Sequence, residues 1–239
     1  MIEEILPAGV VAVDTFDDPP DAALLPEEEH IVAKAVEKRR REFTTARHCA
    51  RAALGRLGVA PVAILSGRLH EPLWPAGIVG TITHCTGYRG VVVAEGSAVT
   101  TVGIDAEPNE PLANGVLAAV ALPDERVHVA ELLEARPEIR WDRMLFCAKE
   151  AVYKAWFPLA QRWLDFEDAV VTLRPGPAGM ASGTFEARLL VVGPRVGGRR
   201  ITGFTGRWMA DHGLILTAIV LGVPAPARRG DERVSSGHR

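Results

Sequence analysis

The chain has few cysteines and no large excess of either charge. Its three cysteines, Cys49, Cys85 and Cys147, are too far apart for a zinc motif or a redox pair. The formal net charge of -3 over 239 residues argues against a dedicated nucleic-acid binder, which needs an excess of positive charge. We find no basic-then-apolar leader and no apolar run long enough to cross a bilayer. These absences predict a cytoplasmic protein without nucleic-acid or membrane partners.

Lysine is also scarce. The chain holds 27 basic residues, yet only Lys34, Lys38, Lys149 and Lys154 are lysines. A lysine ammonium is a compact charge whose pKa shifts readily, whereas arginine stays charged under ordinary conditions. Two of the lysines lie five residues apart in one short segment, which indicates a chemical requirement there. Lys34 and Lys38 show no comparable requirement.

The first half of the chain predicts one strand, one long helix and a hairpin. Val10 to Val13 is β-branched and reads as a strand, and apolar residues then recur at helical spacing from 26 to 58. The runs 78–83 and 91–94 predict a hairpin with a wide turn, and 100–105 predicts a further strand.

The second half repeats this plan. A helix is expected from Leu122, followed by a longer one from about 138 to 156 that Pro158 stops. The later strands are expected at 170–173, 183–192 and 214–221. Two halves with a long helix and clustered strands predict an α+β fold with pseudo-duplicated subdomains, not a parallel doubly wound sheet.

These patterns suggest three segments. Residues 1–108 form an N-terminal subdomain and residues 109–223 a C-terminal subdomain, because Pro108 and Pro111 close the first group of strands. Residues 224–239 are rich in Pro, Arg, Gly and Ser and are expected to be a disordered tail. Nearly half of all residues are apolar, enough for a sizeable core.

Acidic and basic side chains gather in two of these elements. Glu150 and Lys154 lie one turn apart on one face of the long helix, with Lys149 beside them. Asp105 and Glu107 point to the same side at the end of a strand. If the strand end meets the helix, three carboxylates converge, and such oxygen ligands suit Mg²⁺ on a phosphate-bearing substrate.

Each half of this pattern also has an ordinary interpretation. A Glu–Lys pair at this spacing is most often a surface ion pair, and an Asp-x-Glu at a strand end is usually loop polarity. Only the two together favour a metal and phosphate site.

Four blocks of sequence carry a resemblance to a known family. They are Val102–Pro108, Phe146–Trp156, the turn Glu71–Gly77 leading into Gly80–Cys85, and the basic region Lys38–Arg51. Their order and spacing from about 26 to 221 resemble the Sfp-type 4′-phosphopantetheinyl transferases, most closely the actinobacterial branch that activates carrier proteins of lipid and siderophore synthesis. Carrier proteins of polyketide and nonribosomal peptide synthesis are substrates of the same class.

The resemblance implies a 4′-phosphopantetheinyl transferase fold of two similar subdomains related by a pseudo-twofold axis, with coenzyme A between them. In each subdomain a long helix would pack on a small, mainly antiparallel sheet, the nucleotide lying on the N-terminal side and the metal and pantetheine on the C-terminal side. It also implies transfer of the phosphopantetheine arm from coenzyme A to a serine of an apo acyl or peptidyl carrier protein, releasing adenosine 3′,5′-bisphosphate. We expect a monomer.

The resemblance assigns roles to the clustered charges. Asp105, Glu107 and Glu150 would hold Mg²⁺, or Mn²⁺, on the pyrophosphate of coenzyme A. Glu150 is also a candidate base for the carrier serine, directly or through water, although a tight metal ligand is a poor base. Lys154 would contact the transferring phosphate, with Lys149 nearby.

Further coenzyme A contacts follow from the same resemblance. They are Arg39 and Arg47 on the 3′-phosphate or adenine side, Thr83 and His84 on nucleotide phosphates, and Tyr153 and Trp163 along the pantetheine. For these side chains a basic helix face, an ordinary loop histidine and core packing remain alternative interpretations.

The sequence departs from the family where close relatives often carry a basic residue. Ser66 occupies that position, and Arg68 or His70 would have to replace it. The carrier docking surface also stays open among Arg39–Arg41, Asn109–Val120 and Arg199–Arg200. Two other functions remain as alternatives, an acyl-coenzyme A-dependent acyltransferase and a non-catalytic coenzyme A-binding protein.

Overall fold

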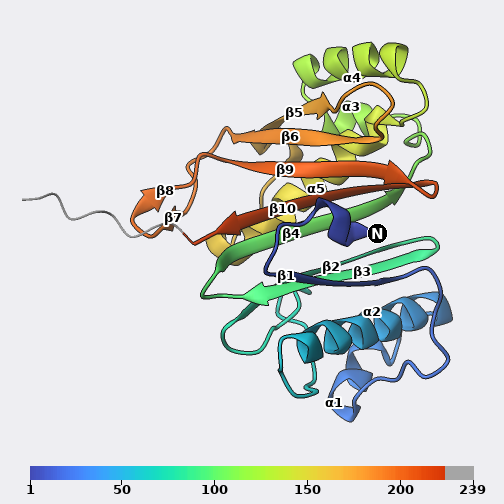
Figure 1. The fold of residues 1–239 in the computed structure, drawn as a ribbon, viewed down its shortest axis with the longest axis vertical. Helices are drawn as coiled ribbons and strands as arrows, with labels where there is room; N and C mark the ends of the chain where they lie inside the picture. The colour runs from blue at the N-terminus through green and yellow to red at the C-terminus, as the bar shows by residue number, and fades with distance from the viewer. Residues whose placement is uncertain (224–239) are drawn as a thin grey trace, which may run out of the picture.

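The computed structural model describes residues 1–223, so the predicted disordered tail at 224–239 lies outside the described part. The described residues form two main antiparallel sheets with a long helix packed on each, and one small two-stranded sheet (Figure 1). The smaller sheet has the strand order β1-β3-β2, and α2 packs on β3 and β1. These elements span Val10–Thr15 (β1), Glu37–Arg56 (α2), Ile78–Cys85 (β2) and Tyr88–Glu95 (β3).

The larger sheet has five strands in the order β4-β10-β9-β6-β5. Helix α5 (Trp141–Ala160) packs against β4 and β10, and the core between helix and sheet holds the fully buried Trp141, Trp156 and Trp208. The strands are Val99–Pro108 (β4), Ala169–Pro175 (β5), Ser182–Leu189 (β6), Gly203–Asp211 (β9) and Leu214–Gly222 (β10). The structure thus agrees with the expected α+β class.

Strand β4 lies where the two halves meet. It pairs with β10 along most of its length and also lies against β2 of the smaller sheet. A division after residue 108 would separate β4 from its hydrogen-bonded partner. The strand pairing therefore favours a division before Val99 over the one predicted from the prolines.

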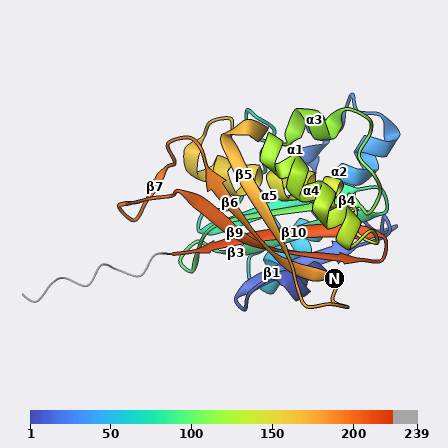
Figure 2. The same cartoon turned by 90° about the horizontal axis from the view of Figure 1, so that it is seen from above.

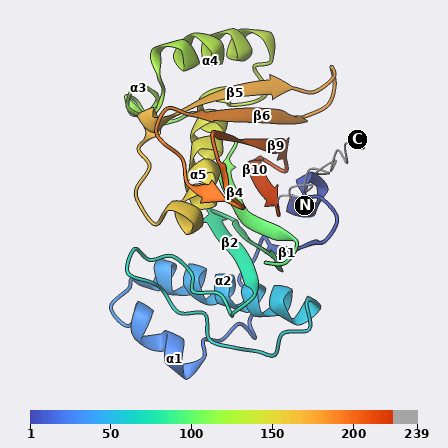
Figure 3. The same cartoon turned by 90° about the vertical axis from the view of Figure 1, so that its left-hand side faces the viewer.

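Short elements complete the fold. Viewed from above, α3 and α4 lie on one side of the larger sheet, and β1 and the N-terminus lie on the other side (Figure 2). Helix α4 lies at the opposite end of the molecule from α2 (Figure 3). The short elements are η1 (Ile2–Ile5), α1 (Pro26–Glu29), η2 (His30–Val32), α3 (Val116–Val120), α4 (Pro123–Ala135), η3 (Phe166–Asp168), β7 (Arg195–Val196) and β8 (Arg199–Arg200).

Three local predictions were wrong. The helix expected over 26–58 is interrupted, because Val36 adopts an extended conformation and α2 begins after it. The hairpin turn is not wide, since Cys85 pairs with Tyr88 and leaves only two residues between the strands. Pro158 lies inside the last turn of α5 instead of stopping it, and the helix ends at Gln161, whose φ is 51°.

Close packing holds α5 against β4. A Cβ on Gly103 would lie 2.1 Å from the carbonyl oxygen of Ala151 and 2.6 Å from the backbone nitrogen of Ala155. Thr101 Oγ1 also donates to the Ala155 carbonyl at 2.9 Å. Because only a glycine fits this contact, helix and strand approach closely there. Asp105 and the middle of α5 are consequently brought side by side.

Candidate functional site

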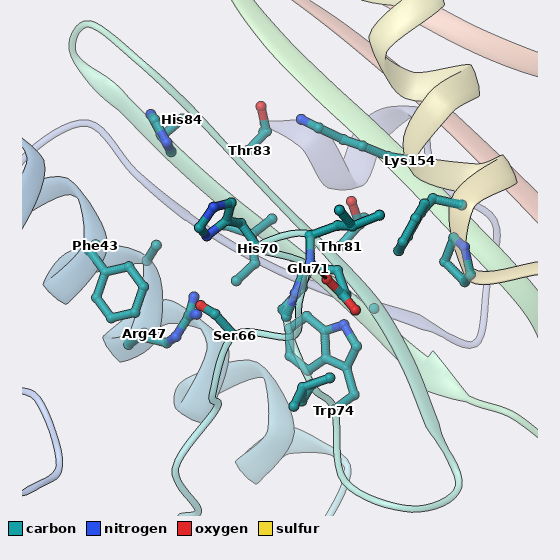
Figure 4. A pocket seen from close by; sticks show the side chains of 18 of the residues that line it. Phe43, Arg47, Ser66, His70, Glu71, Trp74, Thr81, Thr83, His84 and Lys154 are labelled. Atoms are coloured by element: carbon teal, nitrogen blue, oxygen red, sulfur yellow. Dashed lines mark hydrogen bonds between the residues drawn. The ribbon is translucent and has the colours of Figure 1, made fainter. Parts of the chain in front are cut away.

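A cavity of about 1000 Å³ lies between the two halves. Its walls come from α2 and β2 of the smaller sheet's half and from β4 and α5 of the other half. Figure 4 shows Lys154 reaching from α5 toward Thr83, with Arg47 and Phe43 on the opposite wall. Of the predicted coenzyme A contacts, those that line it are Arg39, Arg47, Thr83, His84, Asp105, Tyr153 and Lys154.

Asp105 is the centre of the polar contacts in this cavity. Its Oδ1 accepts a hydrogen bond from Lys154 Nζ at 2.7 Å and another from Thr83 Oγ1 at 3.0 Å. Its Oδ2 is buried and has no hydrogen-bond partner among residues 1–223. Burial opposes the charge of Lys154, but Asp105 and Glu150 outweigh it and raise the pKa of the ammonium. The site therefore holds a stable cation beside an acceptor with unused capacity.

The charge of Asp105 acts on the other two predicted carboxylates, Glu107 and Glu150. Burial raises the pKa of Glu150, and Asp105 adds to this effect while Lys154 opposes it. Burial and then Asp105 likewise raise the pKa of Glu107, against the opposing charge of Arg143. The charge of Asp105 thus raises the pKa of both neighbouring glutamates and makes this end of the cavity a region of negative potential.

The structure pairs two of these carboxylates with basic residues. Asp105 is bound by Lys154, and Glu107 Oε2 accepts from Arg143 Nη1 at 2.9 Å. Within residues 1–223 no three His, Cys, Asp or Glu side chains are grouped as ligands around a common point. The magnesium site therefore stays a prediction. Arg143 was not anticipated from the sequence, because its partner lies on a different element.

Arginine and histidine meet at the α2 side of the cavity. Arg39 Nη1 lies 2.7 Å from His84 Nε2, and Glu42 lies 3.7 Å from the other ring nitrogen. Burial and then the charge of Arg39 lower the pKa of His84. Because a guanidinium only donates, Nε2 of a neutral ring is the acceptor. The neutral ring therefore orients a guanidinium at the edge of the cavity.

Arg47 is more deeply placed. It is only 4% exposed, its Nε donates to the Ile64 carbonyl at 2.7 Å, and its guanidinium lies 4.0 Å from the centre of the Phe43 ring. Burial lowers its pKa to about 10, which leaves it charged at neutral pH. Figure 4 places it beside Ser66. A buried arginine on the cavity wall provides a fixed positive charge there.

The position of Ser66 is supplemented by a neighbouring side chain. His70 lines the cavity together with Ser66, whereas Arg68 is not among the lining residues. Glu71 and Trp74 of the same loop also line it and were not predicted individually. Of the two replacements considered for the missing basic residue, the geometry favours His70.

Lys149 does not line the large cavity with Lys154 but a smaller one, which Glu150, Tyr153 and Trp163 also line. It points away from Lys154, and its Nζ contacts Glu125 Oε2 at 2.8 Å and the carbonyl oxygens of Phe166 and Ala169. The five-residue spacing places the two lysines on different faces of α5. The predicted proximity of Lys149 to the transferring phosphate has no counterpart in this geometry.

A second, smaller cavity of about 130 Å³ lies on the other side of Tyr153. Glu150 and Trp163 line it, and the rings of Tyr153 and Trp163 are 4.8 Å apart. Tyr153 borders both cavities, so Glu150 and Trp163 adjoin the large cavity without lining it.

Comparison with known proteins identifies the family. The family model for the 4′-phosphopantetheinyl transferase N-terminal domain matches residues 27–94, and that for the 4′-phosphopantetheinyl transferase superfamily matches residues 101–192. The gap between the two matches, residues 95–100, includes the start of β4 at Val99. The boundary that the strand pairing favours lies in the same place.

Three bacterial relatives match nearly the whole chain. The 4′-phosphopantetheinyl transferase Svp of Streptomyces mobaraensis is 53% identical over 228 residues, which are 94% of this chain and 91% of Svp. PptT of Mycobacterium tuberculosis is 50% identical over 92% of this chain and 98% of its own length. Npt of Nocardia iowensis is 50% identical over 92% of this chain and 99% of its own length. The chain is therefore a member of the 4′-phosphopantetheinyl transferase family, whose enzymes transfer the phosphopantetheine arm of coenzyme A to carrier proteins.

Proposed function

We propose that the large cavity holds coenzyme A and that the Asp105–Lys154–Glu150 cluster carries out the transfer to a carrier serine. The observation that carries this proposal is a cationic lysine bound to a partly unpaired carboxylate, in a cavity that both family-matched regions line. Its volume is in the range that cofactor sites commonly have.

The cationic side chains divide the coenzyme between them. Arg39, Arg47 and His84 lie on the wall formed by α2 and β2, and they would bind the 3′-phosphate and the nucleotide. Arginine forks suit phosphate oxygens. Lys154, on the opposite wall, would contact the phosphoryl group that is transferred. Thr83 has its hydroxyl engaged with Asp105, so we assign it to holding that carboxylate.

The carboxylates fit a magnesium ion. Asp105 Oδ2 is buried without a partner among residues 1–223, and Glu107 and Glu150 lie within range of its charge. Such an oxygen donor set suits Mg²⁺ or Mn²⁺. Asp105, Glu107 and Glu150 would hold the ion, with Arg143 released from Glu107. When bound, it would polarise the phosphoryl group and neutralise charge on the leaving phosphate.

Glu150 is our candidate for the base. Burial raises the pKa of Glu150, and because a tight metal ligand is a poor base, the proton would reach Glu150 directly or through a water. The serine oxygen would bond to the phosphorus that carries the pantetheine, the pyrophosphate P–O bond would break, and the serine proton would pass to Glu150. Lys154 would stabilise the charge on the phosphoryl oxygens during this step.

The smaller cavity would receive the pantetheine end. Tyr153 and Trp163 present aromatic surface on its walls, next to Glu150. This keeps both aromatic residues in the roles expected from the family.

The proposal also covers the cellular location, the oligomeric state and the partner proteins. No described helix has the length and apolar character of a membrane span. All three cysteines are unpaired thiols in the structure. We propose a cytoplasmic monomer that acts on apo acyl or peptidyl carrier domains.

Intact-mass spectrometry of apo carrier proteins tests the function. Incubation with coenzyme A and Mg²⁺ should add the phosphopantetheine arm to the carrier, and EDTA should stop the reaction until Mg²⁺ is restored. Acetyl-coenzyme A serves as the control, because an acyltransferase would add only the acetyl group. An unmodified carrier in every sample would count against an active enzyme, and turnover in metal-free buffer would count against the magnesium site.

A further inference from the structure

Lys149 belongs to the motif helix but has no place in the proposed chemistry. Its Nζ lies 2.8 Å from Glu125 Oε2, 2.6 Å from the Phe166 carbonyl and 2.9 Å from the Ala169 carbonyl. Its side chain is only 3% exposed. An ammonium has three donors, so all of them are used within the protein. No donor is left for a phosphate.

Its partner Glu125 is also fully engaged. Oε2 accepts from the Leu122 backbone nitrogen and Oε1 from the Val171 backbone nitrogen, each at 2.7 Å. The pair thus joins the start of α4, the middle of α5 and the edge strand β5. Removing one member of such a buried pair leaves an uncompensated charge, which is strongly destabilising.

The two carbonyls that Lys149 binds are at the end of one wall of the smaller cavity. Phe166 is the first residue of η3, and Ala169 directly follows η3. Both belong to the segment 161–169, which begins where α5 ends. Trp163 of this segment is 65% exposed, its ring lies 4.8 Å from the Tyr153 ring, and its Nε1 donates to Asp165 Oδ1 at 2.8 Å. An exposed indole with so few contacts depends on the anchoring of its own backbone.

We propose that Lys149, together with Glu125, is a positioning residue that clamps segment 161–169 to α5 and so holds Trp163 against the smaller cavity beside Glu150. This inference rests on the proposed function, because the occupant of that cavity is the pantetheine end of coenzyme A. The two lysines of the motif then have separate tasks. Lys154 meets the phosphate, and Lys149 shapes the wall for the uncharged arm.

Two ligands that differ by the arm test this assignment. Coenzyme A contains the nucleotide and the phosphopantetheine, whereas adenosine 3′,5′-bisphosphate contains the nucleotide part alone. In Lys149→Met, calorimetric titration should show coenzyme A affinity reduced about tenfold or more, since a small displacement of a positioning group has effects of this size. The affinity for the bisphosphate should stay unchanged. The exposed Lys34→Met is the matched control and should alter neither affinity.

A second variant guards against simple unfolding. Glu125→Gln combined with Lys149→Met removes the uncompensated carboxylate, so its melting temperature should lie closer to that of the unmodified protein. It should show the same selective loss of coenzyme A affinity, because the two carbonyls still lack their donor. Trp163→Ala should reproduce the loss alone and add little in the Lys149 background, which a double-mutant cycle measures.

The possible results separate the two proposals. If the unmodified protein binds neither ligand, the proposed function fails. If it binds both, and the folded variants keep the ratio of the two affinities, the positioning role of Lys149 is overturned. An equal loss of both ligands would also overturn it, because that pattern indicates general damage to the fold.

Discussion

Helices α2 and α5 invite comparison, because each has 20 residues and each packs on its own sheet. Helix α2 presents Arg39 and Arg47 to the large cavity, whereas α5 presents Lys154 there and Glu150 just beyond. One helix thus provides fixed positive charges, and the other provides a carboxylate with a raised pKa next to an ammonium. Under the proposed function, α2 would recognise the nucleotide and α5 would carry out the chemical step.

The space around Gly103, which faces α5, differs from the space around Gly55 of α2. Helix α5 touches β4 at Gly103 so closely that no side chain fits, whereas a methyl group added at Gly55 of α2 would meet nothing within 4 Å. Gly55 lies on the exposed side of α2, so the close contact at Gly103 concerns α5, the helix proposed to carry the reacting groups, and its strand. Catalytic groups need such precise placement more than groups that only bind.

The largest effect on the rate of transfer is expected from a change in α5, the helix proposed to carry the reacting groups. Glu150→Ala removes the proposed base, so the rate of arm transfer should fall about a thousandfold. Coenzyme A should still bind, because the nucleotide contacts come from α2 and β2. Intact-mass assays of the carrier measure the rate, and titration calorimetry measures binding. Glu134→Ala, an exposed change on α4, is the control, and a normal rate in Glu150→Ala would remove our central assignment.

The difference in packing predicts the next effect. Gly103→Ala would push a methyl group into the α5 backbone and should lower the free energy of unfolding by about 3 kcal/mol. Gly55→Ala, the matched change in α2, should raise it by about 0.5 to 1 kcal/mol, because alanine favours a helix more than glycine does. Urea titrations of both variants measure the difference. An unchanged free energy of unfolding in Gly103→Ala would contradict the close contact between α5 and β4.

A change in α2, the helix proposed to bind the nucleotide, should alter ligand affinity and leave kcat nearly unchanged. Arg39→Ala removes a charged donor from the nucleotide wall, so the affinity for coenzyme A and for adenosine 3′,5′-bisphosphate should each fall about tenfold. The kcat should change by less than about twofold, because the lost contact is made equally in ground and transition states. Arg41→Ala is the control, since Arg41 is exposed and pairs with Glu37. A kcat loss without a binding loss would contradict the division between the helices.

The smallest expected effect concerns pH. The pKa of His84 is lowered from 6.5 by burial and by Arg39, with Lys154 and Arg89 contributing and Glu42 opposing. The unfolded chain then takes up the proton more readily, so this contribution to stability is present above about pH 6.5 and is lost as pH falls through the folded-state value. His84→Gln should flatten this dependence, because glutamine does not titrate. Urea titrations between about pH 7.5 and 5.5 measure it, and the exposed His30→Gln should leave it unchanged.

Much of the fold could be predicted from local patterns. Runs of β-branched and apolar residues located β1, β2, β3, β4, β5, β6 and β10, and proline signals located α4 and α5. Strand β9 was missed, although Phe204, Gly206 and Trp208 are buried in alternation with exposed Thr205 and Arg207. Gly203 and Gly206 weaken the strand signal of this run, because glycine is depleted in strands.

The candidate site could be predicted only where residues share an element or a family motif. The spacing of Glu150 and Lys154 predicted a common face, and Asp105 indeed meets Lys154. The contacts of Lys149 and the contact of Arg143 with Glu107 involve partners 17 to 36 residues away. No spacing rule on one helix reveals such partners, because tertiary packing decides which face of α5 meets which segment.

The hydroxyl of Thr83 has a consequence for how ligands enter. It donates to Asp105 and accepts from the backbone nitrogen of Ala106, so it bridges β2 of one sheet and β4 of the other at the floor of the cavity. A hinge opening of the two halves at this point would break both bonds. Access for a bulky coenzyme is thus expected through rearrangement of the loop around His70 and Glu71, while the strand framework beneath stays closed.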